Sequence, residues 1–140
     1  METTQALDTI GTLVMHLKGY AAKLPAVVHL AAVPGGVRPK FESIEVFEQT
    51  LSRFREQAGS SPFKRFTPLF TESLEAFEVG NVLGTIQPVL AVLDQIEQLN
   101  REKLVTVGTQ DRARIAEYRT SLHKMLPGNQ PELEGAGRGL

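Results

Sequence analysis

The stretch TIQPVLAVLDQIEQLNREKLV, residues 85–105, constrains the fold of this chain more than any other. Its apolar residues recur at steps of three and four, as in an α-helix, rather than alternating as in a half-buried strand. They are Ile86, Val89, Leu90, Val92, Leu93, Ile96, Leu99 and Leu104. Plotted on a helix they cover roughly half of the circumference, which is wider than the stripe of an ordinary surface helix. The pattern therefore predicts a central helix that touches more than one neighbour.

Helical spacing also marks four other stretches, so the predicted helices span about 4–24, 41–58, 67–79, 85–105 and 109–126. Thr67, Thr85 and Thr109 are the expected N-caps, because a threonine hydroxyl accepts a hydrogen bond from a free amide of the first turn. Pro25 predicts a break after the first helix. The apolar segment 26–33 that follows is interpreted as a short buried helical extension in preference to a buried extended segment. Pro34, Gly35 and Gly36 end it.

These connections are short, so sequential helices should pack as antiparallel neighbours. The sequence predicts an all-α, single-domain helical bundle of about five helices, up-and-down-like, over residues 1–126. Residues 127–140, PGNQPELEGAGRGL, are rich in glycine and proline and hold little that could be buried. They predict a disordered C-terminal tail.

Bulk composition fits a folded domain and argues against several functions. Hydrophobic residues make up 41% of the 140 and charged residues 22%, near the averages of globular proteins. The net charge of −1 does not support an electrostatic clamp on nucleic acid. The absence of cysteine excludes disulfides, thiolate metal sites and cysteine nucleophiles. The sequence has no signal-peptide pattern and no apolar run long enough to span a membrane. We therefore expect a cytoplasmic protein that does not associate with membranes.

Catalytic and metal-binding signatures do not occur in the sequence. There is no G-x-S-x-G elbow and no phosphate-binding glycine loop with its Lys-Ser/Thr pair. His16, His29 and His123 lie on separate segments, without the H-E-x-x-H or E-x-x-H spacing that places ligands on one helix face. We therefore expect no enzyme activity, no cofactor and no metal.

All seven phenylalanines fall between residues 41 and 77. They predict an ordinary aromatic core, which is the preferred interpretation, an aromatic pocket for a small apolar ligand between the second and third helices, or a groove for a partner helix. Phe63 lies off the helical stripes. It is interpreted either as an exposed anchor or, preferentially, as a residue that packs against the start of the third helix. Lys64 and Arg65 beside it are a small basic pair flanked by aromatic rings, a weak sign of single-strand binding.

Charge is uneven along the chain. Residues 38–65 and 103–126 carry a basic excess, while 66–102 is acidic, so complementary surfaces could meet within the bundle or across a dimer. The predicted fifth helix bears Arg112, Arg114, Tyr118 and Arg119 after a glycine turn, which weakly suggests a DNA-recognition helix. Its acidic Asp111 and Glu117 would oppose phosphate.

The second half of the 85–105 helix is less apolar than the first. Glu97 and Asn100 fall within its buried arc, where without partners they would cost several kcal/mol between them. Either they form a polar layer with Tyr118 or His123, or this end leaves the core. Glu97 and Arg101 also have the order of an i,i+4 ion pair, which favours exposure.

The sequence therefore favours a non-catalytic protein–protein interaction module, such as a regulatory, adaptor or accessory subunit, that binds a protein partner or a second copy. A helical bundle with an aromatic ligand pocket is the alternative, and a small nucleic-acid-associated protein ranks third. The candidate interaction residues are Phe63, Lys64, Arg65, Glu97, Asn100 and Arg101.

Overall fold

The computed structural model describes residues 1–21 and 39–126. These residues form five α-helices and one 3₁₀-helix, with no strand. The α-helices are α1 (Thr3–Ala21), α2 (Phe41–Ala58), α3 (Thr67–Glu78), α4 (Val82–Arg101) and α5 (Thr109–Met125), and the 3₁₀-helix η2 covers Pro62–Phe66. The predicted all-α bundle is confirmed. The predictions for the end of the first helix, for segment 26–33 and for the tail at 127–140 lie outside the described residues.

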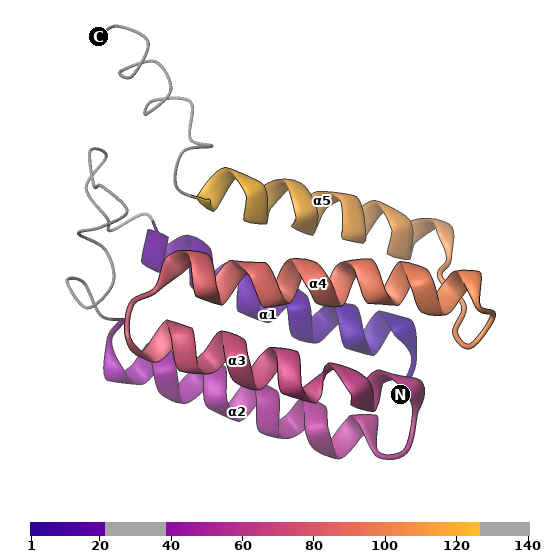
Figure 1. Cartoon of the computed structure of the whole chain (residues 1–140), viewed down its shortest axis with the longest axis horizontal. Coiled ribbons are helices and arrows are strands. Elements are labelled where there is room, and N and C mark those ends of the chain that lie inside the picture. Colours follow the sequence, from indigo (N-terminus) through magenta and orange to yellow (C-terminus); the bar gives the residue numbers. More distant parts are fainter. Residues whose placement is uncertain (22–38, 127–140) are drawn as a thin grey trace, which may run out of the picture.

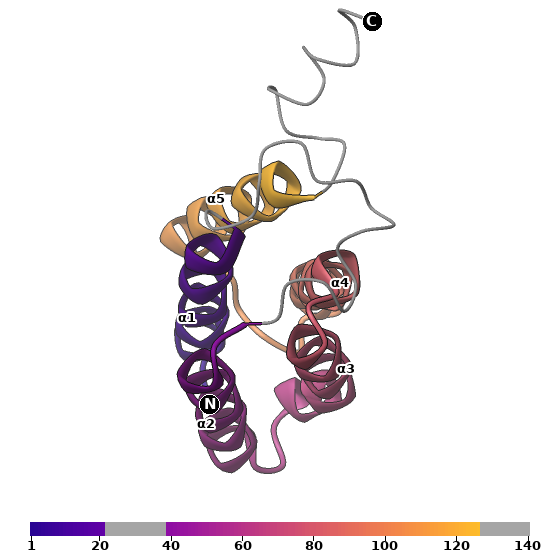
Figure 2. The ribbon, with the colours of Figure 1, turned by 90° about the vertical axis from the view of Figure 1, so that its left-hand side faces the viewer.

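Successive helices run in opposite directions, as the up-and-down-like prediction requires (Figure 1). Seen end-on, α5, α1 and α2 form one layer, and α4 and α3 form the other (Figure 2). Each of α2 to α5 packs against the helix before it, and α1 also packs against α5. This last contact joins the two ends of the helical array and closes the bundle.

Most of the core comes from α1 and α4, with phenylalanine rings supplied by α2, η2 and α3. Helix α4 has the wide buried arc that its sequence predicts. Its buried residues are Val82, Thr85, Ile86, Pro88, Val89, Val92, Leu93, Ile96 and Leu99. Leu104 is the exception, because it lies beyond the end of the helix and its side chain is 50% exposed.

The start of α4 differs from the prediction. The helix begins at Val82, three residues before Thr85, and its N-cap is Asn81. The Asn81 Oδ1 accepts a hydrogen bond of 2.9 Å from the Gly84 amide. Thr85 is already helical, and its hydroxyl donates to the Asn81 carbonyl at 2.7 Å. Pro88 consequently lies inside the helix rather than in its first turn.

The end of α4 was also predicted wrongly, since the helix stops at Arg101 and not at residue 105. Lys103 takes the left-handed conformation, with φ of 63°. The Leu104 amide donates to the Leu99 carbonyl at 2.9 Å and the Lys103 amide to the Asn100 carbonyl at 3.0 Å. These two bonds form a Schellman motif, which usually has glycine at the left-handed position. A lysine there gave no sequence signal that the helix ends.

Two other expected N-caps are replaced by neighbouring residues. Thr67 has helical dihedral angles, because η2 runs directly into α3, so it does not cap the helix. At α5 the N-cap is Gly108, and Thr109 is the first helical residue. The Gly108 amide donates to Asp111 Oδ2 at 3.2 Å, which places an acidic group at the positive end of the helix dipole.

Candidate protein interface

The aromatic zone is mainly core. The rings of Phe47 and Phe77 stack with centroids 4.8 Å apart, and Phe54 meets Phe70 edge-on at 4.8 Å. These pairs join α2 to α3 and fill the space where a ligand pocket was considered. None of the four pockets described for the structured residues is lined by Phe47, Phe70 or Phe77. The ligand-binding alternative therefore gains no supporting observation.

Phe63 is not an exposed anchor, because only 2% of its surface is accessible. The connector between α2 and α3 is itself a turn of 3₁₀-helix, and it directs Phe63 and Phe66 inward with ring centroids 5.9 Å apart. The preferred interpretation, packing near the start of the third helix, is confirmed. Lys64 and Arg65, between the two rings, are both exposed.

The candidate residues of α4 are used within the molecule. Glu97 does not pair with Arg101: its Oε1 accepts from Arg119 Nη1 on α5 at 2.9 Å, and the same arginine binds Asp94 at 2.6 Å. Arg101 instead donates to Gln98 Oε1. The hydrogen bond with Glu97, followed by that with Asp94, raises the pKa of Arg119 above its usual value despite partial burial. Part of the charge complementarity noted in the sequence is thus satisfied between α4 and α5.

Asn100 positions the loop after α4. Its Oδ1 accepts a 3.2 Å hydrogen bond from the amide of Val107, whose side chain is buried. The polar side chain in the buried arc is therefore satisfied by the backbone, and not by Tyr118 or His123. This contact gives Asn100 a structural role in the turn that leads into α5.

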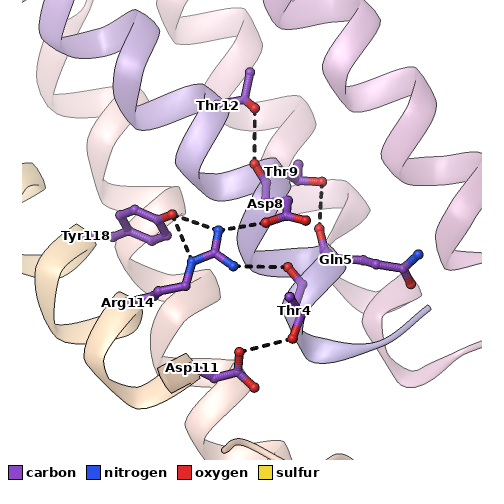
Figure 3. Close-up of polar contacts among 8 residues, drawn as sticks. All are labelled: Thr4, Gln5, Asp8, Thr9, Thr12, Asp111, Arg114 and Tyr118. Atoms are coloured by element: carbon purple, nitrogen blue, oxygen red, sulfur yellow. Dashed lines mark hydrogen bonds and ion pairs between the residues drawn. The ribbon is translucent and has the colours of Figure 1, made fainter. Parts of the chain in front are cut away.

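Polar contacts also join the first and last helices (Figure 3). Arg114 on α5 binds Asp8 Oδ1 at 2.8 Å and Tyr118 Oη at 2.9 Å through Nη2. Burial lowers the pKa of Arg114, but the hydrogen bonds to Tyr118 and Asp8 outweigh it and leave the pKa raised. With Arg119 bound to α4, two of the three arginines of the suggested recognition helix hold the bundle together. Nucleic-acid binding through α5 gains no support from this arrangement.

A groove lies on the surface where α2, η2 and α3 meet, and it has a volume of about 760 Å³. We call it the α2–α3 groove. It is lined by Gly59, Thr67, Pro68 and Thr71 together with the charged residues Arg55, Lys64, Glu72 and Glu75. The Phe54–Phe70 contact joins α2 to α3, and the burial of Phe63 and Phe66 holds η2 against the core. The groove is thus a surface feature on a rigid support.

The charged side chains of the groove have no partners among the described residues. Every ion pair found in this part of the chain involves Arg114 or Arg119. Arg55 and Lys64 are basic, Glu72 and Glu75 are acidic, and all four are exposed. The groove therefore presents exposed charge of both signs beside a lining of short or apolar side chains, a composition suited to a protein surface.

A second pocket of about 570 Å³ lies at the opposite side of the connector, where the N-terminus meets the α4–α5 loop. Two of its hydroxyl groups are already bound: the Thr3 hydroxyl donates to the Thr106 carbonyl at 2.8 Å, and that of Thr4 to Asp111 Oδ1 at 3.2 Å. Leu104 is its main exposed apolar side chain. The satisfied polar groups make this pocket a weaker interface candidate than the α2–α3 groove.

The sequence indicated Lys64 but missed Arg55, Glu72 and Glu75. They come from two helices, and the spacing of residues within one helix does not reveal that side chains of two helices line the same groove. The available signal was the short connector, which makes α2 and α3 antiparallel neighbours. Thr67, Thr71 and Glu75 are also spaced at about one helical turn along α3, so they lie on one side of it, with Pro68 next to Thr67.

The described residues contain no group of three or more His, Asp or Glu placed to hold a metal ion. His16 and His123 lie on α1 and α5, and His29 falls outside the described residues. Among the described helices, none combines the length and the apolar character needed to cross a membrane.

Comparison with known proteins gives no family for this chain. No family model matches it, and neither the curated proteins nor the solved structures contain a significant match.

Proposed function

We propose that this protein is a non-catalytic interaction module, a regulatory, adaptor or accessory subunit that binds a protein partner through the α2–α3 groove. The observation that supports the proposal is the set of four exposed charges in the groove, which have no ion-pair partner among the described residues. The charged side chains at the α1–α5 and α4–α5 contacts, by contrast, form ion pairs within the bundle. Charges arranged around a concave surface favour one orientation of a partner and exclude others.

Site-specific photo-crosslinking in the cell of origin tests this proposal. A photoreactive phenylalanine analogue replaces Thr71, an exposed residue of the groove, and in a matched control it replaces Ala113, an exposed residue of α5. We expect a discrete crosslinked protein from position 71 and none from position 113. The crosslink should disappear when Glu72→Lys and Glu75→Lys are added.

A position-71 variant that folds but gives no discrete product would contradict the proposal. Equal products from both positions would contradict it as well, since they would reflect random collision. Circular dichroism of each variant shows whether the helical fold is retained.

A further inference from the structure

The charges of the α2–α3 groove are separated by sign along the helix axes. Arg55 lies in the last turn of α2 and Lys64 in η2, so both lie at the connector end. Glu72 and Glu75 lie further along α3, away from the connector. Phe54 contacts Phe70, so the neighbouring Arg55 lies level with the first turn of α3, and at 1.5 Å per residue Glu72 and Glu75 lie about 5 and 9 Å further along that helix. One groove therefore has a basic end and an acidic end.

Such a layout is complementary to itself. When two copies of one groove face each other across a two-fold axis that runs perpendicular to the groove, each end of the groove meets the opposite end of its mate. The basic end of one groove then faces the acidic end of the other, and this happens twice. The parallel arrangement would place like charges together and is disfavoured.

The lining between the charged ends also permits close approach. Thr67 and Thr71 are one turn apart on α3, and their short side chains leave the helix surface low. Pro68 beside them is exposed and adds an apolar ring that has no backbone amide to satisfy. Two α3 helices could therefore pack along this strip with the charges at its ends.

We propose that the α2–α3 groove is the interface of a symmetric homodimer, in which Arg55 and Lys64 of one copy pair with Glu72 and Glu75 of the other. This inference rests on the proposed function and specifies the partner as a second copy of the chain. The four charges cancel within each groove, and the pairs lie at the edge of the interface. Dimerisation should consequently weaken as salt screens the pairs.

Charge reversal with complementation tests the interface. The wild-type chain should sediment as a dimer in the micromolar range. Reversing the acidic end, Glu72→Lys with Glu75→Lys, or the basic end, Arg55→Glu with Lys64→Glu, should weaken self-association by at least about tenfold, because like charges then face each other. An equimolar mixture of the two variants should restore the dimer as a heterodimer.

The matched control is Glu45→Lys with Glu48→Lys, which changes the net charge as much as reversal of the acidic end. Both residues line a different pocket, nearer the start of α2 and away from the connector. This control should dimerise like the wild type. Because the chain contains no cysteine, disulfide trapping tests the antiparallel order as well. A mixture of Lys64→Cys and Glu72→Cys chains should crosslink more than either variant alone.

A wild-type chain that is monomeric throughout the micromolar range would overturn the homodimer. So would a dimer that both groove variants leave intact, or a mixture of the two that stays monomeric. The proposed function has a separate outcome: if the crosslink from position 71 joins a different protein, the interaction module stands and the homodimer fails. A crosslink to a second copy supports both, and no crosslink contradicts both.

Discussion

Lys103 carries the least favourable backbone conformation among the described non-glycine residues, with φ of 63°. In this region of backbone conformation the Cβ of a residue clashes with its own carbonyl oxygen, which costs about 1–2 kcal/mol. Lys103→Gly removes that strain but gives the unfolded chain more freedom, so we expect a net stabilisation of about 0.5–1 kcal/mol. Urea unfolding measures it as a raised midpoint with an unchanged slope.

Glu117→Gly serves as the opposite case, because Glu117 lies exposed inside α5 and glycine there should destabilise by about 1 kcal/mol. If Lys103→Gly destabilised the protein in the same way, the left-handed end of α4 would be refuted.

Asn100 shows how one polar side chain can define a loop. Asn100→Ala removes the acceptor of the Val107 amide. We expect a loss of about 1 kcal/mol, since alanine's better helix propensity offsets part of the lost hydrogen bond. Asn100→Asp keeps an acceptor oxygen and should lose less. Denaturant unfolding compares the two variants, and amide exchange at Val107 should accelerate mainly in the alanine variant. Equal losses in both would show that the hydrogen bond is unimportant.

At the scale of elements, Gly11 sets how closely α1 and α5 approach. A Cβ built on Gly11 would lie 2.5 Å from the Tyr118 hydroxyl, whereas one on Gly19, in the same helix, would meet nothing within 4 Å. Overpacking in Gly11→Ala should cost about 1–3 kcal/mol. Alanine's better helix propensity offsets about 0.5–1 kcal/mol of it, so we expect a net loss of up to about 2 kcal/mol. Gly19→Ala should stabilise it by about 0.5–1 kcal/mol through helix propensity.

Thermal or urea unfolding of these two alanine variants checks the contact between α1 and α5. Adding Tyr118→Phe to Gly11→Ala removes the nearest atom and should recover part of the loss. Additive effects of the two substitutions would mean that Tyr118 does not lie over Gly11.

The helices themselves follow from sequence because each buries one face, and that face repeats at three and four residues. Their ends follow local contacts that the repeat does not record. Asn81 caps α4 in place of Thr85, because the residues between them, Val82 to Gly84, are already helical. Lys103 ends α4 without a glycine. Such choices depend on which backbone groups find partners after folding.

The candidate site was predictable only in part, for a related reason. Lys64 stands out beside two phenylalanines, but Phe63 could be exposed or buried until the 3₁₀ conformation of the connector is known. Glu97 and Arg101 have ideal spacing for a pair, yet Arg119 from α5 competes for the glutamate. Periodicity within one segment cannot foresee a partner from another. The groove charges share this property because they come from α2, η2 and α3.

At the scale of the whole molecule, stability should be uneven. Helix α4 buries nine residues, whereas α5 buries only Ile115, Leu122 and Met125 and relies on the Arg114 and Arg119 contacts. Few buried contacts permit local opening below the free energy of global unfolding. We therefore expect α5 to exchange its amides earlier than α4. Helix α3 also buries three residues, but two of them are phenylalanines paired with rings of α2, so α3 should exchange later than α5 as well.

The double substitution Arg114→Met with Arg119→Met should accelerate exchange in α5 and leave α3 and α4 nearly unchanged, because it removes the ion pairs to Asp8, Asp94 and Glu97 while retaining the aliphatic stems. Hydrogen exchange followed by mass spectrometry resolves the helices. Arg112→Met, at an exposed position of the same helix, is the matched control and should change little. The expectation would be wrong if the amides of all helices in the wild type exchanged together, through global unfolding alone. The bundle would then be one cooperative unit, and α5 would be held as firmly as α3 and α4 hold each other.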